Sequence, residues 1–484
     1  MNEEKSIYLI ITDTAKKEHL SAYGYERLTT PFLEDFQEDS TKFTNAVSQS
    51  PWTLPSHASM FTGKYPSEHG AVQENPYMDS QQTLSSVLDK NGYKTGIFSA
   101  NAWISPHTGL AQGFGVKENF IGNLPSPAEK LTSYAWKKSN ENRYLKRLAN
   151  KMTELLSWIH NNVTGQRYDS YTPQIMESSK QFVEQNKGEK KFVCMNLLDP
   201  HLPYDPPIDS IQEFEDLEEI PDVCLDQNEY NSGGVDINEE EWRKIKLLYD
   251  AEIRYADRKI EEFVQFLKDK NEYEDSLIII CSDHGELHGG HDLYGHQFAL
   301  YEDLINVPLF IKHPNEETGV SDQLVELMDL FHTVIDFAGV EADYNEARSI
   351  FNSDYRDPEM VQYPDHAFSE YSKPLVVLEQ LEKSATKNGI QLSEDSRYKS
   401  AMISVRDSNG KYIHRSNTED EFYSFREDRS EMDNILHSEE DVEGYLDIVN
   451  SFERVGVVDV ESVGSDVIDD SIKDRLDNLG YLEN

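Results

Sequence analysis

The segment from Pro51 to Gly63 places a hydroxyl group at the expected start of a helix. Thr53 comes two residues before Pro55, and proline is favoured in the first turn of a helix. The free N–H groups at a helix N-terminus favour an anion and lower the pKa of a nearby hydroxyl. We therefore expect Thr53 to act as a nucleophile.

Four further polar side chains come at or soon after the ends of short apolar runs: Asp13, His201, Asp283 and His284. In α/β proteins, ligands bind beyond the carboxyl ends of the strands, which share one edge of the sheet. We therefore expect these side chains to converge. Two carboxylates and an imidazole, with the hydroxyl of Thr53, form a mixed oxygen and nitrogen ligand set that suits a divalent cation.

The strands and helices that position these residues are indicated by short apolar runs, which alternate along the sequence with helical patterns. The runs predict buried strands at residues 7–11, 95–99, 192–198, 277–281 and 307–311. The patterns between them predict helices at residues 31–37, 84–90, 144–160, 174–185, 241–267 and 327–339. This alternation is typical of an α/β domain with a mostly parallel central sheet flanked by helices. We assign residues 1–340 to this domain, with residues 122–190 as a lid insertion.

The pattern changes after about residue 340. Residues 401–405, 411–414 and 421–425 predict an antiparallel meander, with a hairpin turn at Ser408-Asn409-Gly410. We therefore expect a smaller C-terminal α+β subdomain at residues 341–437. The rest, residues 438–484, reads as an acidic tail with a terminal helix at 471–479.

The composition is strongly acidic. Asp and Glu number 90 against 45 Lys and Arg, which gives a net charge of −45. Such a surface repels nucleic acid and anionic membranes, so we expect neither as a partner. The same charge destabilises a compact fold unless salt screens it. We therefore expect a high-salt interior of the haloarchaeal kind.

Two further observations bear on location. The three cysteines, Cys194, Cys224 and Cys281, are widely spaced and odd in number, which favours free thiols in a reducing compartment. No signal peptide is recognised at the start, and no apolar run approaches ~18 residues. We expect a cytoplasmic protein without a membrane span.

The motifs resemble those of the sulfatase family, within the alkaline phosphatase superfamily. Residues 51–63 resemble its nucleophile motif, Cys/Ser-x-Pro-x-Arg followed by Ala-Ser-x-x-Thr-Gly, and residues 10–14 and 282–286 resemble its two metal motifs. Further similarity lies at residues 65–70, 300–308, 422–428 and 479–481. The resemblance implies an alkaline-phosphatase-like fold with one divalent metal ion. It also implies that Asp13, Asp283 and His284 bind that ion and that Thr53 is the nucleophile.

Two departures from the family pattern bear on the mechanism. Thr53 stands where the family has Cys or Ser, and His57 stands where it has Arg. Sulfatases oxidise that Cys or Ser to formylglycine, and threonine is not a known source of the aldehyde. We therefore expect no formylglycine, but an unmodified Thr53 alkoxide that forms a Thr ester. This chemistry favours a phosphate or phosphonate ester, whereas the family favours a sulfate ester.

The metal motif departs from the family pattern as well. Thr14 replaces the second Asp that usually follows the first, and His284 is an imidazole ligand. This set looks more like phosphonate monoester hydrolases and lipoteichoic-acid-synthase-like enzymes than like calcium sulfatases. A His beside carboxylates favours Mn²⁺ or another transition ion, with Mg²⁺ and Ca²⁺ as the alternatives.

The remaining site residues are assigned from their place in the motifs. His201 is expected to protonate the leaving group, a role that suits a side chain whose ordinary pKa lies near neutrality. His296 and Asn101 stand where sulfatases usually carry anion-binding lysines, and we expect both to contact substrate, with His296 and His57 also catalytic. The expected site thus has fewer fixed cations than a sulfatase site. This makes a small, fully charged anion less suitable as a substrate, and a diester or a large conjugate remains a candidate.

Three other histidines have less specific surroundings. His69 is expected to be a structural hydrogen-bonding residue. His288 and His291, separated by Gly289-Gly290, predict either a mobile loop or, as the less favoured reading, a second metal pair.

The leading hypothesis is a metal-dependent hydrolase of an anionic sulfate or phosphate ester, on a glycan or lipid conjugate or on a smaller molecule. One alternative is a transferase that moves a phospho- or sulfo-group onto a glycan or lipid. Another is a catalytically degenerate member of the family that binds an anion or a protein partner.

Overall fold

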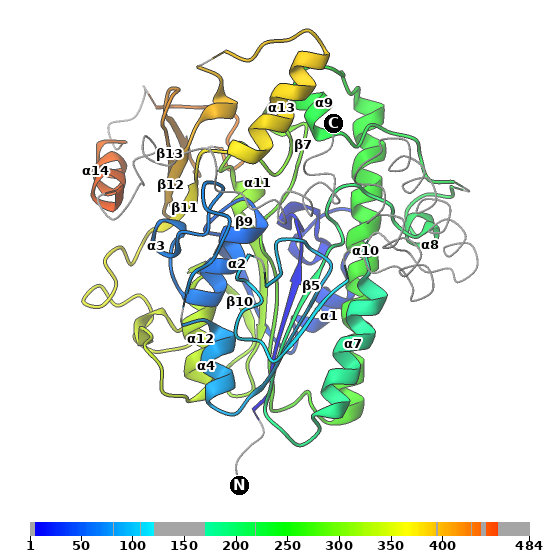
Figure 1. Ribbon diagram of the computed structural model, residues 1–484, viewed down its shortest axis with the longest axis vertical. Helices are drawn as coiled ribbons and strands as arrows, with labels where there is room; N and C mark the ends of the chain where they lie inside the picture. Colours follow the sequence, from blue (N-terminus) through cyan, green and yellow to red (C-terminus); the bar gives the residue numbers. More distant parts are fainter. Residues whose placement is uncertain are drawn as a thin grey trace, which may run out of the picture.

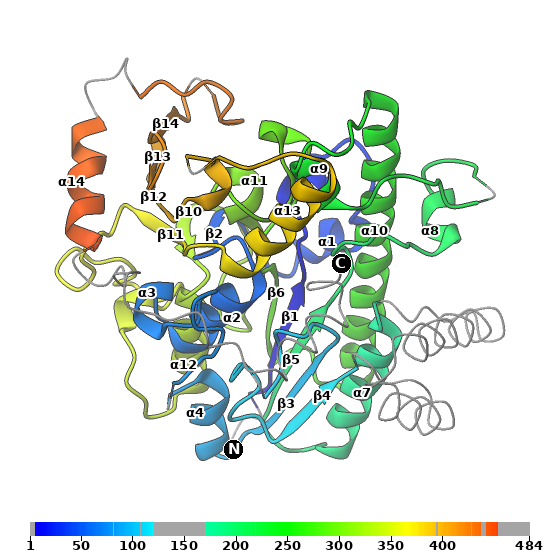
Figure 2. The same ribbon diagram turned by 45° about the horizontal axis from the view of Figure 1, so that its top comes forward.

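The computed structural model describes residues 5–436, apart from 81, 107, 121–169, 218, 394 and 427, together with residues 442–453. Its centre is an eight-stranded sheet in the order β10-β2-β9-β6-β1-β5-β3-β4 (Figures 1 and 2). The strands are β1 (Ile7–Thr12), β2 (Thr41–Val47), β3 (Lys94–Ser99), β4 (Val116–Asn119), β5 (Lys191–Leu197), β6 (Leu277–Ser282), β9 (Asn306–Lys312) and β10 (Gly319–Glu326).

The sheet is parallel except at β9, which runs antiparallel to both β2 and β6. β1 lies between β5 and β6, with Ile7 opposite Phe192 on one side and Leu277 on the other. The carboxyl ends of these three strands therefore lie side by side, as expected for a sheet that gathers functional groups at one edge.

Both faces of the sheet are covered by helices, which explains the near-continuous apolar runs in its strands. On one face Ile7, Leu9 and Ile11 join a core with α2 (Thr53–Thr62), α4 (Leu84–Lys90) and α12 (Asp329–Ala338). On the other face Tyr8 and Ile10 join a second core with α1 (Pro31–Phe36), α7 (Thr172–Gln185) and α10 (Glu239–Lys270). The alternation along β1 follows the two-residue period of a strand.

A smaller antiparallel sheet lies beside the first, in the order β11-β12-β13-β14. Its strands are β11 (Ala367–Tyr371), β12 (Met402–Arg406), β13 (Gly410–Arg415) and β14 (Glu421–Ser424). The hairpin between β12 and β13 turns at the predicted Ser408-Asn409-Gly410. A third pair joins β7 (Leu287–His288) to β8 (Tyr294–Gly295).

The shorter helices lie around these sheets. They are α3 (Pro66–His69), α8 (Ile208–Gln212), α9 (Gln227–Asn231), α11 (Glu302–Ile305), α13 (Leu375–Lys387) and α14 (Val442–Glu453). Helix α14 falls in the segment expected to be an acidic tail, and it packs on the small sheet through Tyr445 and Val449, which are buried with Phe368 and Phe422.

The fold class is confirmed, as are all five predicted strands. Three strands of the central sheet were missed, β2, β4 and β10, and so were β7, β8 and β11 in the smaller sheets. Strand β10 is mostly exposed and β4 has no buried residue, because each is an edge strand and neither needs an apolar run.

Of the segment 122–190 expected to form a lid, residues 172–185 form α7, which packs against β3 and β5. Residues 121–169, with the helix expected at 144–160, lie outside the described residues, as does the terminal helix expected at 471–479. No described helix combines the length and the apolar character that a membrane crossing requires.

Candidate active site

The strand ends bring together the three residues expected to bind metal. Asp13 follows β1, and Asp283 and His284 follow its neighbour β6. Their ligand atoms lie within 4.8 Å of one another. His284 Nε2 is 3.5 Å from Asp283 Oδ2 and 3.8 Å from Asp13 Oδ1, and all three side chains are completely buried.

These groups fit a cation because their facing atoms have no other partner. Asp13 Oδ1, Asp283 Oδ2 and His284 Nε2 are buried and make no hydrogen bond in the structure. Unpaired buried polar atoms are costly in a folded protein, and such costs are offset where the atoms bind an ion. Burial, and then the Asp13 charge, raise the pKa of Asp283 well above its ordinary value. A divalent cation would oppose that shift, since it favours the charged carboxylate.

Thr14 stands where the family pattern has a second Asp. It contributes its backbone to the site, since its N–H donates to Asp283 Oδ1 over 3.3 Å. Its φ of 60° is rare for a β-branched residue and marks local strain. The chain therefore turns sharply after Asp13, and the turn orients Asp283.

Thr53 is the first residue of α2, as predicted, and it is buried at the helix N-terminus. Its Oγ1 accepts a hydrogen bond from Asn101 Nδ2 over 3.3 Å. The same Asn101 nitrogen donates to Asp13 Oδ2 over 2.7 Å. Asn101 therefore connects the expected nucleophile to an expected metal ligand, a contact that its sequence position did not predict.

Asn196 is a site residue that the sequence analysis missed. Its Nδ2 donates to Asp13 Oδ2 over 3.2 Å, and its Oδ1 accepts from Ser99 Oγ over 3.1 Å. The available signal was a fully buried amide inside the apolar strand β5. Asp13 Oδ2 thus receives two amide donors, while Oδ1 faces the unpaired cluster.

His57 lies beside the candidate metal ligand Asp283, one turn along α2 from Thr53. Its Nδ1 donates to the Thr53 carbonyl over 3.0 Å and is 3.5 Å from Asp283 Oδ2. Burial lowers the pKa of His57 to about 4, so the ring is neutral near pH 7. Its Nε2 is buried without a hydrogen-bond partner in the structure.

Two further predicted histidines gather beside His284. The ring centroid of His296 lies 4.6 Å from that of His284 and 5.2 Å from that of His201. Nδ1 of His201 lies 2.6 Å from the Leu202 carbonyl, which fixes it as the N–H donor. Burial lowers the pKa of His296 to about 3.

Glu286 is a second residue whose role the sequence did not reveal. Its Oε1 lies 3.2 Å from Nδ1 of His296, and the Tyr204 hydroxyl donates to its Oε2 over 3.4 Å. Burial raises the pKa of Glu286 to about 8. Glu286 comes two residues after His284, within residues 282–286. An acidic residue at this place in the motif was the sequence feature that could have indicated a role.

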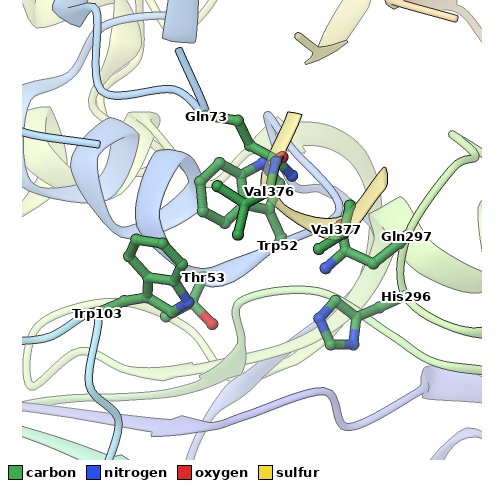
Figure 3. A pocket seen from close by; sticks show the side chains of 8 residues that line it. All are labelled: Trp52, Thr53, Gln73, Trp103, His296, Gln297, Val376 and Val377. Atoms are coloured by element: carbon green, nitrogen blue, oxygen red, sulfur yellow. Dashed lines mark hydrogen bonds between the residues drawn. The ribbon is translucent and has the colours of Figure 1, made fainter. Parts of the chain in front are cut away.

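Thr53 and His296 line one small pocket (Figure 3). Its other lining residues are Trp52, Gln73, Trp103, Gln297, Val376 and Val377. The two indole rings pack edge to face at 5.2 Å. None of these eight lining residues is a lysine, an arginine or an acid, and both valines come from α13 of the smaller C-terminal part.

The other histidines have local roles. His69 accepts from the Ala71 N–H at Nδ1 and lies 3.2 Å from Ser59 Oγ. His288 lies against Tyr249, at a centroid distance of 4.5 Å, and His291 stacks on Tyr301 at 3.6 Å. In the described part of the chain, neither His288 nor His291 belongs to a cluster that could hold a metal ion, so a second metal pair is not supported.

Comparison with known proteins identifies the family. A family model described as Sulfatase matches residues 5–340. An arylsulfatase of Clostridium perfringens is 24% identical over 409 residues, which cover 77% of this chain and 83% of that protein.

Solved structures extend the likeness to the fold. The phosphonate monoester hydrolase of Agrobacterium radiobacter superposes with a TM-score of 0.68 at 18% identity, covering 93% of this chain and 95% of that one. BT4656 in complex with its substrate D-glucosamine-2-N,6-O-disulfate gives a TM-score of 0.66 at 17% identity, covering 94% and 98%.

Proposed function

The chain belongs to the sulfatase family, and on that premise we propose that it is a metal-dependent hydrolase of sulfate or phosphonate and phosphate esters with Thr53 as its nucleophile. The observation that carries the proposal is the contact of Thr53 Oγ1 with Asn101, which also binds Asp13. Asp13 faces Asp283 and His284 with three unpaired ligand atoms. The proposed nucleophile and the proposed ligands therefore lie close together, and their side chains are buried.

Asp13, Asp283 and His284 would hold the metal ion, with the Thr53 hydroxyl as a further ligand. A divalent ion supplies Lewis-acid stabilisation of the developing charge and favours the ionised hydroxyl. The His ligand favours Mn²⁺ or another transition ion over Ca²⁺, with Mg²⁺ as the alternative.

The protein groups supply the rest of the reaction. Thr53 Oγ1 gives its proton to a water molecule and forms a bond to sulfur or phosphorus, while the bond from that atom to the alcohol oxygen breaks. His201 gives a proton to the departing oxygen. A water molecule then attacks the same sulfur or phosphorus, releases the anion and restores the Thr53 hydroxyl. Asn101 donates to Oγ1, which stabilises its negative charge.

The lining of the pocket favours a singly charged ester. Its eight residues carry neither lysine nor arginine, so the neutral donors Asn101 and His296 must replace a fixed cation. The charge of a divalent ion would already be balanced by Asp13 and Asp283, so a dianionic phosphate monoester is costly to bury where the other groups are neutral donors. Sulfate monoesters, phosphonate monoesters and phosphate diesters each carry one charge and suit this site better.

The proposal includes an unmodified Thr53. Threonine carries a methyl group on Cβ, unlike the Cys and Ser from which formylglycine is made. The acidic composition further supports a high-salt cytoplasm as the place of action, where salt screens the net charge of −45.

The test is an assay of the purified chain with an aryl sulfate, an aryl phenylphosphonate, a bis-aryl phosphate and an aryl phosphate, with and without Mn²⁺. We expect metal-dependent turnover of at least one singly charged ester, and a loss on the order of 10³-fold or more in Thr53→Ala. Thr62→Ala is the matched control, because the Thr62 hydroxyl bonds to the Ala58 carbonyl at the far end of α2. Absence of turnover, or a Thr53→Ala enzyme equal to wild type, would contradict the proposal.

A further inference from the structure

A buried hydrogen-bonded chain leads away from the pocket behind His296. Glu286 Oε1 lies 3.2 Å from Nδ1 of His296. The Tyr204 hydroxyl lies 3.4 Å from Glu286 Oε2 and 3.0 Å from Nε2 of His288. All four side chains are buried. These hydrogen bonds therefore link His296, at the pocket lining, through Glu286 and Tyr204 to His288 in the core.

The proton count along this chain gives each contact a direction. Tyr204 has one hydroxyl proton, and Glu286 Oε2 can accept it. His288 then donates its Nε2 proton to the Tyr204 oxygen, which leaves Nδ1 as the unprotonated nitrogen of that ring. His288 Nδ1 is buried and without a partner in the structure, in agreement with this assignment.

The carboxyl of Glu286 is therefore held from both sides. On one side the His296 ring contacts Oε1, and on the other the Tyr204 hydroxyl contacts Oε2. Tyr204 and His288 pack against Tyr249, with ring centroids 5.4 and 4.5 Å away. The end of the hydrogen-bonded series away from the pocket is therefore enclosed by aromatic rings. A carboxyl fixed in this way presents Oε1 in one direction, toward the ring of His296.

Contact with Glu286 settles which edge of His296 faces the pocket. Because Nδ1 is engaged by the carboxyl, Nε2 is the ring nitrogen left for substrate. Figure 3 shows this far nitrogen pointing toward the side of the pocket where Thr53 lies. His296 also lines the pocket together with Thr53.

We propose that Glu286, backed by Tyr204, is a positioning residue that fixes the ring of His296 so that its Nε2 contacts the ester group attacked by Thr53. The inference rests on the proposed function and assigns a role to a residue that the metal site does not use. Histidines that bind a metal are commonly oriented in this manner by an outer carboxylate, whose loss costs ~10–100-fold, and the same orienting contact here acts on a histidine that lines the pocket.

The kinetic test is a double-mutant cycle on the full-length protein with Glu286→Ala, His296→Ala and the double variant. We expect Glu286→Ala to lower kcat by about 10–100-fold with a smaller change in KM. In the His296→Ala background the same change should cost less than about twofold, because the residue acts through the ring. Additive losses in the two backgrounds would overturn the proposal.

Two further variants separate positioning from folding. Glu286→Gln has a side-chain oxygen and an NH₂ group, so it can hydrogen-bond Nδ1 in either tautomer of the ring and should recover part of the activity lost in Glu286→Ala. Tyr204→Phe removes only the rear contact and should have a milder effect. Asp257→Asn is the control: it makes the same carboxyl-to-amide change at a buried position of α10, where Asp257 accepts from the backbone of α1.

Metal content and the ring signals complete the test. Glu286 follows His284 by two residues, so the metal bound by each variant is measured, and a loss of metal that matches the loss of activity would overturn the proposal. Nitrogen NMR of the His296 ring should show one fixed tautomer in wild type and averaged signals in Glu286→Ala. This measurement does not require an active enzyme. If the ring signals depend on Glu286 but the protein turns over no ester, the positioning role stands and the proposed function is rejected. Unchanged ring signals would reject the positioning role.

Discussion

The side-chain amide of Asn101 donates to Oδ2 of Asp13 over 2.7 Å. Asn101 follows β3 and Asp13 follows β1, with β5 between the two strands. The same nitrogen is 3.3 Å from Thr53 Oγ1. One neutral side chain therefore fixes both the expected nucleophile and the expected ligand, at a position where sulfatases usually carry a lysine.

Replacing Asn101 by alanine should impair catalysis more than folding. A hydrogen bond to a charged oxygen contributes ~1.5–3 kcal/mol, so we expect kcat to fall by roughly 10–100-fold. Steady-state kinetics with metal content measured on the same sample checks this. Asn186→Ala is the control, since the Asn186 amide bonds the Phe182 carbonyl at the end of α7. A change in kcat of less than about threefold would contradict the link.

Thr53 should remain unmodified. The peptide that contains it is expected to have the mass of threonine, and after a rapid quench with substrate it should gain a sulfuryl or phosphoryl group. High-resolution mass spectrometry distinguishes the two groups. Thr53→Ser, expressed with and without a formylglycine-generating enzyme, is the informative comparison. An aldehyde at Thr53 in the wild-type chain would show the mechanism to be wrong.

Metal binding should stabilise the fold. An ion that binds only the native state at 100 times its Kd adds ~2.7 kcal/mol to the free energy of unfolding. We expect Mn²⁺ to raise the melting temperature of the metal-free protein and Asp283→Asn to abolish that increase. Asp257→Asn should keep the full increase. An equal response of wild type and Asp283→Asn would place the ion elsewhere.

The free energy of unfolding should fall as pH rises through a window set by Asp257. Burial raises the pKa of this carboxyl to about 7, against an ordinary value of about 3.9. Between these values the folded state holds a proton that the unfolded state has lost. The stabilisation is thus complete below about pH 4 and decreases by at most ~1.4 kcal/mol per pH unit up to about pH 7.

The measurement for Asp257 is chemical denaturation at several pH values. Asp257→Asn cannot ionise and should lack this part of the decline, whereas the exposed Asp269→Asn on the same helix should keep it. Parallel curves for wild type and Asp257→Asn would show that the carboxyl does not titrate in this window.

Salt should stabilise the protein. With a net charge of −45, self-repulsion in the compact state is large at low ionic strength. The Debye length falls from about 10 Å at 0.1 M to 3 Å at 1 M, so we expect a higher free energy of unfolding in 1 M KCl. Equal or greater stability at 0.1 M would remove the argument for a high-salt compartment.

The sequence by itself determined the central layers and the approach of Asp13, Asp283 and His284 to one another. Strands buried on both faces require apolar runs, so β1, β5 and β6 were readable, and the polar residues directly after them had to meet at one edge of the sheet. Asp13, Asp283 and His284 are therefore close in space, as their positions predicted. Edge strands such as β10 have no such requirement and were missed.

Only the tertiary structure decided which side chains touch behind those strand ends. The contacts of Asn101 with Thr53 and of Glu286 with Tyr204 join segments far apart in the chain, and that of Glu286 with His296 closes a ten-residue loop. The direction of each side chain depends on its rotamer and on neighbours supplied by other strands and helices. Residue type and spacing do not specify the rotamer or these neighbours. The contacts of Asn196 and Glu286 with site residues could therefore be identified only from the folded structure.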